Sequence, residues 1–368
     1  MINRYSTQDE ELDQEIWKWI ERAGGGPNAD LVHQMMVTSL KMLKDNPDRG
    51  DLKIMNTSLK EMRYTWKVFS PYRHRRKVTL FGSARTPEDH PDYATAAEFS
   101  RKMAAHGFMT ITGGGNGIMK AGNEGAGRDD SFAANIRLPF EQVSNDVIAG
   151  DAKLINYKYF FTRKLAFLKE SHAVVCCPGG FGTHDEGFET LTLVQTGKSH
   201  MMPIVFLHSS DDRFWFDWQD YVKERLLKSR LISPEDLSLY KVTGDVDEAV
   251  EEVVSFYRRY HSSRYVGDSL VVRLQCPLQS EELQSLNEEF ADLLVNGKIE
   301  PCAALKQEAG DPDIAHLPRL RFRFNRRRYG RLRQLIDRIN AFPLPTTETI
   351  ESPEVGLGGS IPDEIDAD

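Results

Sequence analysis

Hydrophobic positions in the first 70 residues recur at helical spacing. Leu12, Ile16 and Ile20 share one face of a predicted helix, and Leu31 and Met35 repeat the pattern after the Gly-Gly-Gly-Pro break at 24–27. The pattern predicts an N-terminal helical segment over residues 1–70. We expect it to cover a core or to present a surface to a partner helix rather than to carry out catalysis.

From residue 77 the pattern changes to short apolar runs that alternate with amphipathic stretches. The predicted strands are 78–81, 108–112, 132–136, 173–177, 204–207 and 239–242. The predicted helices are 93–105, 118–125, 159–171, 185–196, 215–228 and 246–260. This alternation is typical of an α/β domain with a doubly wound parallel sheet, a Rossmann-like fold, which we place at residues 71–262. Ligands of such sheets bind beyond the carboxyl ends of the strands.

The pattern changes again near residue 263. Strands are predicted at 269–276, near 298–302 and at 317–324, with helices at 281–294 and 329–339, which indicates a small α+β appendage over residues 263–342. The last stretch, 343–368, combines prolines, glycines and acidic residues. That composition predicts a disordered acidic tail.

Composition and charge narrow the class of protein. The 368 residues are 40% hydrophobic and 28% charged, which fits a globular chain with more than one core. The net charge of −8 argues against nucleic acid as a partner. No apolar run approaches the ~20 residues of a membrane span and the N-terminus lacks a signal peptide, so we expect a cytoplasmic protein. The four cysteines, Cys176, Cys177, Cys276 and Cys302, have no metal-ligand spacing, and no metal site is expected.

Three glycine-containing turns follow three of the predicted strands. They are Phe81-Gly82-Ser83-Ala84-Arg85, Thr112-Gly113-Gly114-Gly115-Asn116-Gly117-Ile118-Met119 and Pro178-Gly179-Gly180-Phe181-Gly182-Thr183. Glycines let backbone N–H groups approach an anion, and the helix that follows points its positive end at it. Neither the dinucleotide fingerprint nor a Walker A loop fits, because Ile118 and Asp185 stand where a third glycine belongs and no Gly-Lys-Ser/Thr follows. The turns predict a phosphate site of another kind.

Two further features allow a structural or a functional interpretation. Thr183-His184-Asp185-Glu186 fits a capping box, with Thr183 as N-cap, but Glu186 also lies where a carboxylate could face a ribose. Arg163 and Lys164 lie near the start of a predicted helix, where positive charge is unfavourable. They are either a solvated surface pair or part of a site, since a local cost can mark function.

The combination of Arg163-Lys164 with Pro178-Gly179-Gly180-Phe181-Gly182-Thr183-His184-Asp185-Glu186 resembles the signature of the Lonely Guy (LOG) family, across about residues 77–260. Members are often labelled lysine decarboxylases and are nucleoside 5′-monophosphate phosphoribohydrolases. The resemblance implies that Arg163 and Glu186 are the catalytic pair and that residues 179–183 cradle the 5′-phosphate. The remaining residues expected at the substrate are Ser83, Gly113, Gly114, Gly115, Glu141, Lys164 and Thr192.

Two positions depart from the family pattern. The usual Leu-Glu-Glu is here His184-Asp185-Glu186, and the second turn is closer to that of the longer bacterial members than to that of the plant cytokinin enzymes. The base could therefore be a purine, as in an AMP nucleosidase, a pyrimidine or a cytokinin. The resemblance also implies a homodimer or a higher homo-oligomer.

The expected activity is cleavage of the N-glycosidic bond of a nucleoside 5′-monophosphate, without a cofactor. A decarboxylase that uses pyridoxal phosphate needs a Schiff-base lysine, and neither Lys164 nor Lys198 fits that role. The alternative is a carrier, because molybdenum-cofactor carrier proteins have a similar fold and a similar Pro-Gly-Gly-x-Gly-Thr turn. The joint presence of Arg163 and Glu186 favours the hydrolase.

An arginine-rich run at residues 319–328 follows a strand-like alternation. It places Leu320, Phe322 and Phe324 on one face and the arginines on the other, which predicts a half-buried strand with a solvated arginine face. The alternative is a contact with an anionic effector or a nucleic acid.

Overall fold

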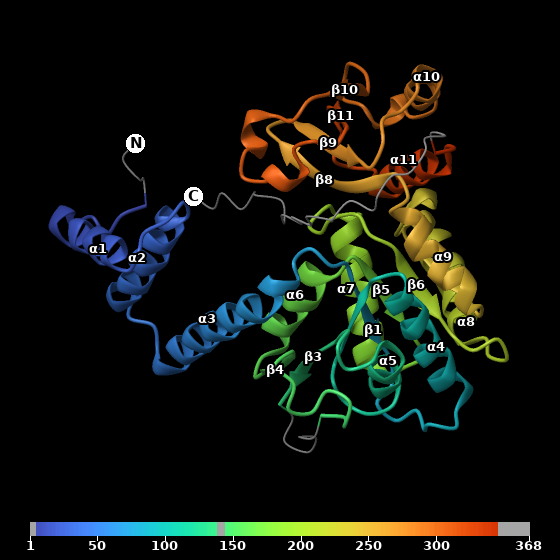
Figure 1. The fold of residues 1–368 in the computed structure, drawn as a ribbon, viewed down its shortest axis with the longest axis horizontal. Coiled ribbons are helices and arrows are strands. Elements are labelled where there is room, and N and C mark those ends of the chain that lie inside the picture. Colours follow the sequence, from blue (N-terminus) through green and yellow to red (C-terminus); the bar gives the residue numbers. More distant parts are fainter. Residues whose placement is uncertain (1–4, 138–143, 345–368) are drawn as a thin grey trace. The chain divides into compact units, whose positions relative to one another are not determined.

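A computed structural model of the chain describes residues 5–137 and 144–344 (Figure 1). The chain divides into two compact units, Met1–Glu61 and Met62–Asp368. The first unit holds α1 (Glu10–Arg22), α2 (Ala29–Asp45) and the beginning of α3 (Arg49–Phe69). Its small core consists of Ile16, Ile20 and Val37, which confirms the helical pattern that the sequence predicts.

The second unit is built on a seven-stranded parallel sheet of order β4-β3-β2-β1-β5-β6-β7. The strands are β1 (Lys77–Phe81), β2 (Met109–Thr112), β3 (Ser131–Ile136), β4 (Leu154–Tyr157), β5 (Ala173–Cys176), β6 (Ile204–Leu207) and β7 (Lys241–Thr243). The central strands β1, β2, β5 and β6 are buried along their whole length, as expected where helices cover both faces. The prediction of a doubly wound, Rossmann-like α/β domain is thus confirmed.

Helices alternate with these strands along the chain (Figure 1). They are α4 (Pro91–Ala105), α5 (Ile118–Ala126), α6 (Phe160–Glu170), α7 (Phe181–Gln195), α8 (Phe214–Tyr221), continued by a π-helical turn at Val222–Leu227, and α9 (Val246–Phe256). The chain runs outward from β1 in both directions, through β2 on one side and β5 on the other. The carboxyl ends of these three strands therefore meet at the switch point of the sheet, where ligands bind.

A small antiparallel sheet of order β10-β11-β9-β8 follows in the chain. Its strands are β8 (Tyr260–Val266), β9 (Ser269–Leu274), β10 (Glu300–Cys302) and β11 (Arg319–Phe322), accompanied by α10 (Ser280–Glu289) and α11 (Tyr329–Ala341). The sequence did not predict β8, because we extended the preceding helix to residue 260. The helix ends earlier, where the Asn340 side chain accepts hydrogen bonds from the backbone N–H groups of Arg259 and Tyr260.

The arginine-rich run at residues 319–328 agrees with the prediction only in part. Leu320, Phe322 and Phe324 are buried, as the alternation predicts. The prediction of a wholly solvated arginine face is wrong, because Arg319 is only 2% exposed and its Nε lies 3.1 Å from the Glu308 carboxylate. The carboxylate also binds Arg273 at 2.6 Å, so Glu308 joins two buried guanidinium groups.

Two negative findings concern the described residues alone. No helix among them is long and apolar enough to cross a membrane. No group of three or more His, Cys, Asp or Glu side chains within 5–137 and 144–344 is arranged to hold a metal ion. The predicted tail lies outside the described residues from position 345 on.

Candidate functional site

The three glycine turns are fused by backbone hydrogen bonds. The N–H of Ser83, in the first turn, donates to the Pro178 carbonyl of the third turn at 3.0 Å. The N–H of Ile118, at the end of the second turn, donates to the Ser83 carbonyl at 3.0 Å. The turn after β1 thus lies between the turns after β2 and β5 and fixes their relative positions.

Glycine is required at two of these junctions. A Cβ on Gly179 would lie 2.1 Å from the Thr183 hydroxyl oxygen, and one on Gly117, where φ is +61°, would lie 2.3 Å from the Ser83 carbonyl oxygen. Both approaches are too close for any side chain. By contrast, a Cβ on Gly180 or Gly182 would meet nothing within 4 Å. These two glycines therefore border open space, in which a ligand can approach the backbone.

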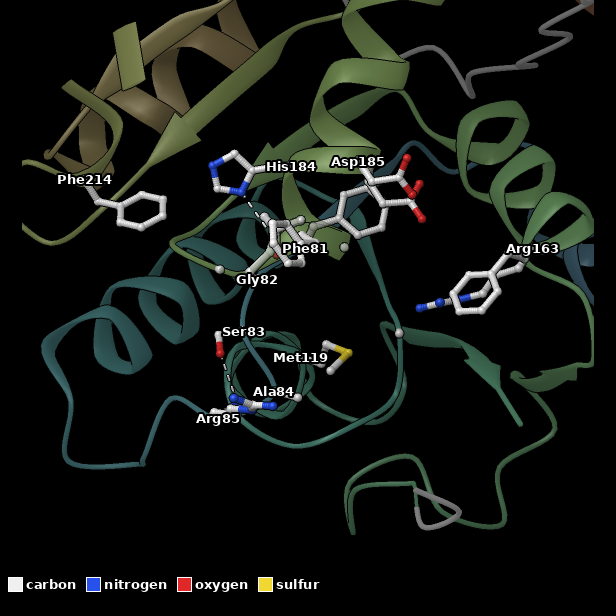
Figure 2. A pocket seen from close by; sticks show the side chains of 18 residues that line it. Phe81, Gly82, Ser83, Ala84, Arg85, Met119, Arg163, His184, Asp185 and Phe214 are labelled. Atoms are coloured by element: carbon white, nitrogen blue, oxygen red, sulfur yellow. Dashed lines mark hydrogen bonds between the residues drawn. The ribbon is translucent and has the colours of Figure 1, made fainter. Parts of the chain in front are cut away.

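A cavity of about 1120 Å³ opens over the fused turns (Figure 2). Among the predicted site residues, those lining it are Ser83, Gly113, Arg163, Gly179, Gly180, Phe181, Gly182, Thr183 and Glu186. These residues come from four separate segments of the chain. The structure therefore brings most of the predicted site together around one cavity.

Helix α7 points its N-terminus into this cavity. The helix begins at Phe181 with Gly180 as N-cap, and no side chain caps it. The capping-box interpretation of Thr183 and Glu186 is therefore wrong, because Thr183 already lies within the first turn of the helix. The Gly180 carbonyl accepts from the N–H groups of Thr183 and His184. In the described part of the chain the N–H groups of Phe181 and Gly182 have no partner, which is the arrangement that binds anions at helix starts.

Glu186 is a buried carboxyl group without an ion pair or side-chain hydrogen bond among the described residues. It is 7% exposed, lines the cavity and lies little more than one turn into α7. Burial raises the pKa of Glu186 to about 7, against the opposing effect of Lys164 and Arg163. Such a carboxyl group exchanges protons near neutral pH and is suited to acid–base work.

Arg163 lies on α6 and points into the cavity from another side than α7 (Figure 2). Its Nε donates to the Ala134 carbonyl at 2.9 Å, and its guanidinium group lies 5.1 Å from the centre of the Phe167 ring. Burial lowers the pKa of Arg163, and the Glu186 carboxylate opposes that effect. No ion pair joins Arg163 to Glu186 in the described chain, so the two groups can both face a molecule between them.

Other predicted residues lie apart from the cavity lining. The Lys164 Nζ lies 2.7 Å from Asp185 and 2.6 Å from Glu189, so two carboxylates already hold it. The Thr192 hydroxyl donates to the Phe188 carbonyl of its own helix. Gly114 and Gly115 belong to the second turn but do not line the cavity. Glu141 lies outside the described residues.

Sequence reasoning missed several residues of the lining. Arg85 is the last residue of the first glycine turn, and that position was a usable signal. His184 stands inside the family signature, and its ring contacts those of Phe214 and Trp215. Phe160 begins α6 three residues before Arg163, whereas Phe214 begins α8 far from the motifs in sequence, so no motif indicated Phe214.

The structure shows a Rossmann-like domain with a cavity over its three glycine turns, and comparison with known proteins shows what the chain is similar to. Residues 116–253 match the model of a family described as possible lysine decarboxylase. A probable cytokinin riboside 5′-monophosphate phosphoribohydrolase from Oryza sativa subsp. japonica is 28% identical over 142 residues. That match covers 37% of this chain and 55% of the relative, so it spans about half the relative's length. The residues that match the family model lie within the α/β domain and include the signature that resembles the LOG family.

Solved structures that are similar to part of the chain include proteins of several kinds. The molybdenum cofactor binding protein from Rippkaea orientalis is 15% identical, with a TM-score of 0.36 over 48% of this chain and 94% of that chain. DNA processing protein A from Helicobacter pylori is 14% identical, with a TM-score of 0.34 over 48% of this chain and 79% of that chain.

Proposed function

We propose that this protein hydrolyses the N-glycosidic bond of a nucleoside 5′-monophosphate and releases the free base and ribose 5-phosphate. The observation that carries the proposal is the unpaired, buried Glu186 carboxyl group, which shares a cavity with Arg163 and the open start of α7. The printed name of the rice relative describes the same class of reaction on a cytokinin nucleotide.

The 5′-phosphate occupies the start of α7 in this proposal, bound by the N–H groups of Phe181 and Gly182. Binding of this remote group positions the sugar, so that its binding energy contributes to the reaction at the glycosidic bond. The ribose then lies between Glu186 and Arg163.

The reaction breaks the bond between C1′ and the base nitrogen, and the bonding electrons leave with the base. Positive charge develops on the ribosyl group, and the ionised Glu186 carboxylate stabilises it or orients the attacking water and the ribose hydroxyls. Water adds its oxygen to C1′, and the proton that it loses passes to the departing base, directly or through Glu186. Arg163 holds the substrate or assists departure of the base.

The alternative function is a carrier for a nucleotide or for the molybdenum cofactor. A carrier of a phosphorylated ligand gains nothing from a buried carboxylate in its site, because like charges repel. A phosphoribohydrolase needs such a group for the developing cation. Glu186 therefore favours the hydrolase.

Replacement of Glu186 by Gln tests the proposal, because it keeps the shape of the side chain and removes its charge. Incubation with AMP, GMP, CMP, UMP and a cytokinin riboside 5′-monophosphate should yield base and ribose 5-phosphate with the unmodified protein. The variant should lose at least about 100-fold in kcat for the preferred nucleotide. Glu251→Gln is the matched control, since Glu251 is an exposed residue of α9 outside the cavity. Undiminished turnover by Glu186→Gln would overturn the assignment, and binding without base release by the unmodified protein would favour the carrier.

A further inference from the structure

The site described so far lacks a cation for the substrate's phosphate. A phosphate monoester carries nearly two negative charges at neutral pH. Lys164, the lysine that the sequence placed at the phosphate, is held by Asp185 and Glu189. Arg163 is tied to the Ala134 carbonyl and faces Glu186 across the proposed ribose site. Backbone N–H groups alone would have to hold the phosphate.

Arg85 is a cation whose side chain has no ion pair or hydrogen bond within residues 5–137 and 144–344. It is exposed and lines the cavity from the turn after β1. Figure 2 shows Arg85 next to Ser83 on the wall facing Asp185 and His184. Its backbone N–H donates to the Ser83 hydroxyl oxygen at 3.1 Å. Since Ser83 is also bonded to Pro178, the arginine is anchored to the turn that precedes α7.

The charges of the lining favour a role for this arginine. The ionisable lining residues other than His184 are Arg85, Arg163, Asp185 and Glu186. When both carboxyl groups are ionised, these four charges cancel. Without Arg85, Arg163 would be the only cation among these four groups. A guanidinium group binds phosphate oxygens through two parallel N–H donors, which suits a doubly charged phosphate.

We propose that Arg85 is the phosphate-binding cation of this site and that it holds the substrate's 5′-phosphate together with the Ser83 hydroxyl and the open N–H groups of α7. The Ser83 oxygen accepts from the Arg85 N–H, and the Ser83 O–H proton is then free to donate to phosphate. This inference rests on the proposed function for the identity of the ligand as a 5′-phosphorylated ribose.

Binding of ribose 5-phosphate, measured by calorimetry on the full chain, tests the inference without reference to turnover. Arg85→Gln should raise the Kd for ribose 5-phosphate about 10- to 100-fold. Arg85→Lys should recover part of the loss, since it restores a point charge but not the planar fork. Arg225→Gln, which removes an exposed arginine outside the cavity, should leave the Kd unchanged. An unchanged Kd for Arg85→Gln overturns the inference.

Steady-state kinetics separate phosphate binding from a general effect on the site. With the preferred nucleotide, Arg85→Gln should raise KM by a similar factor and change kcat by less than about threefold, because the contact is the same in ground and transition states. Cleavage of the unphosphorylated nucleoside should not change. An equal loss with nucleotide and nucleoside would contradict phosphate binding.

The two proposals can fail separately. If the unmodified protein binds ribose 5-phosphate but releases no base from any nucleotide, the hydrolase proposal fails and the calorimetry still decides the role of Arg85. If the unmodified protein binds neither ribose 5-phosphate nor nucleotides, both proposals are overturned. Equal unfolding midpoints of Arg85→Gln and Arg225→Gln confirm that a change in Kd is not a change in folding.

Discussion

Two clusters of arginine and carboxylate side chains in this chain behave in opposite ways. Beside the small antiparallel sheet, Glu308, in the segment between β10 and β11, is 3% exposed and binds Arg273 and Arg319 directly, at 2.6 and 3.1 Å. In the cavity of the α/β domain, Glu186 is 7% exposed, and in the described chain it forms no ion pair with Arg163. The residue types are the same, but among the described residues the carboxylate forms ion pairs with the arginines in only one of the two clusters.

The pKa values follow this difference. Burial alone would raise the pKa of Glu308, but the hydrogen bonds from the Leu305 N–H and from Arg273, together with the charge of Arg319, hold it below its ordinary value. Burial raises the pKa of Glu186 to about 7, since Lys164 and Arg163 compensate only in part. Removal of one partner from a buried ion pair leaves an uncompensated charge, whereas a buried ionisable group left unpaired at a cavity is a candidate for chemistry.

The largest expected effect comes from breaking the paired cluster. Glu308→Gln leaves two buried guanidinium groups without their shared carboxylate. Removal of one partner from a buried pair costs about 3–5 kcal/mol, and we expect that loss in the free energy of unfolding. Denaturant titration at neutral pH measures it.

The control for Glu308 is an acidic residue nearby in the chain. Asp313 is exposed and forms no ion pair in the described chain, so Asp313→Asn should change stability by less than about 0.5 kcal/mol. If Glu308→Gln lowered the free energy of unfolding by no more than Asp313→Asn does, the cluster would not stabilise the sheet, and the contrast with Glu186 would be wrong.

Replacement of the unpaired Glu186 carboxyl group should raise stability, whereas replacement of Glu308 lowers it. Its folded-state pKa of about 7 lies above the ordinary 4.5, so the neutral form fits the fold better and wild-type stability falls as the pH rises from 4.5 to 7. Glu186→Gln removes this dependence. The variant should be more stable than the wild type by about 3 kcal/mol at pH 8 and equally stable at pH 4.5. Unfolding curves in phosphate-free buffer measure both, and a difference independent of pH would contradict an uncompensated carboxyl group.

The fold was largely predictable because buried parallel strands are nearly continuous apolar runs. The run at 204–207 is predicted and observed with the same bounds. Strand β4 was missed, because only Ile155 and Tyr157 of its four residues are buried and its apolar signal is short. Strand β8 was missed because we extended the preceding helix to residue 260, and because only Tyr260 and His261 of its seven residues are buried.

The part of the site that depends on the backbone geometry of a sequence motif could be predicted. The part that depends on side-chain partners from distant segments of the chain could not. The glycine turns and Glu186 meet at one cavity, as their positions after the strands implied. The pairing of Lys164 with Asp185 and Glu189 joins two helices, and the burial of Arg319 depends on Glu308 in a loop. Both depend on tertiary packing, so neither residue's surroundings follow from its local sequence.

The smallest expected effect concerns the nearby positive charges, which partly oppose the effect of burial on the pKa of Glu186. If the ionised carboxylate stabilises the ribosyl cation, kcat/KM should rise with pH around a midpoint near 7. The positive charge of Lys164 lowers the pKa of Glu186, and Lys164→Met removes that charge. The substitution also leaves Asp185 and Glu189 without their ion pair to Lys164, and the negative charges of these two residues raise the pKa of Glu186. The midpoint should therefore move upward by roughly 0.5–1 pH unit. Lys169→Met, on the same helix but paired with Glu170, should leave the midpoint in place. A midpoint unmoved by Lys164→Met would mean that Lys164 only joins α6 to α7 and does not tune the carboxyl group.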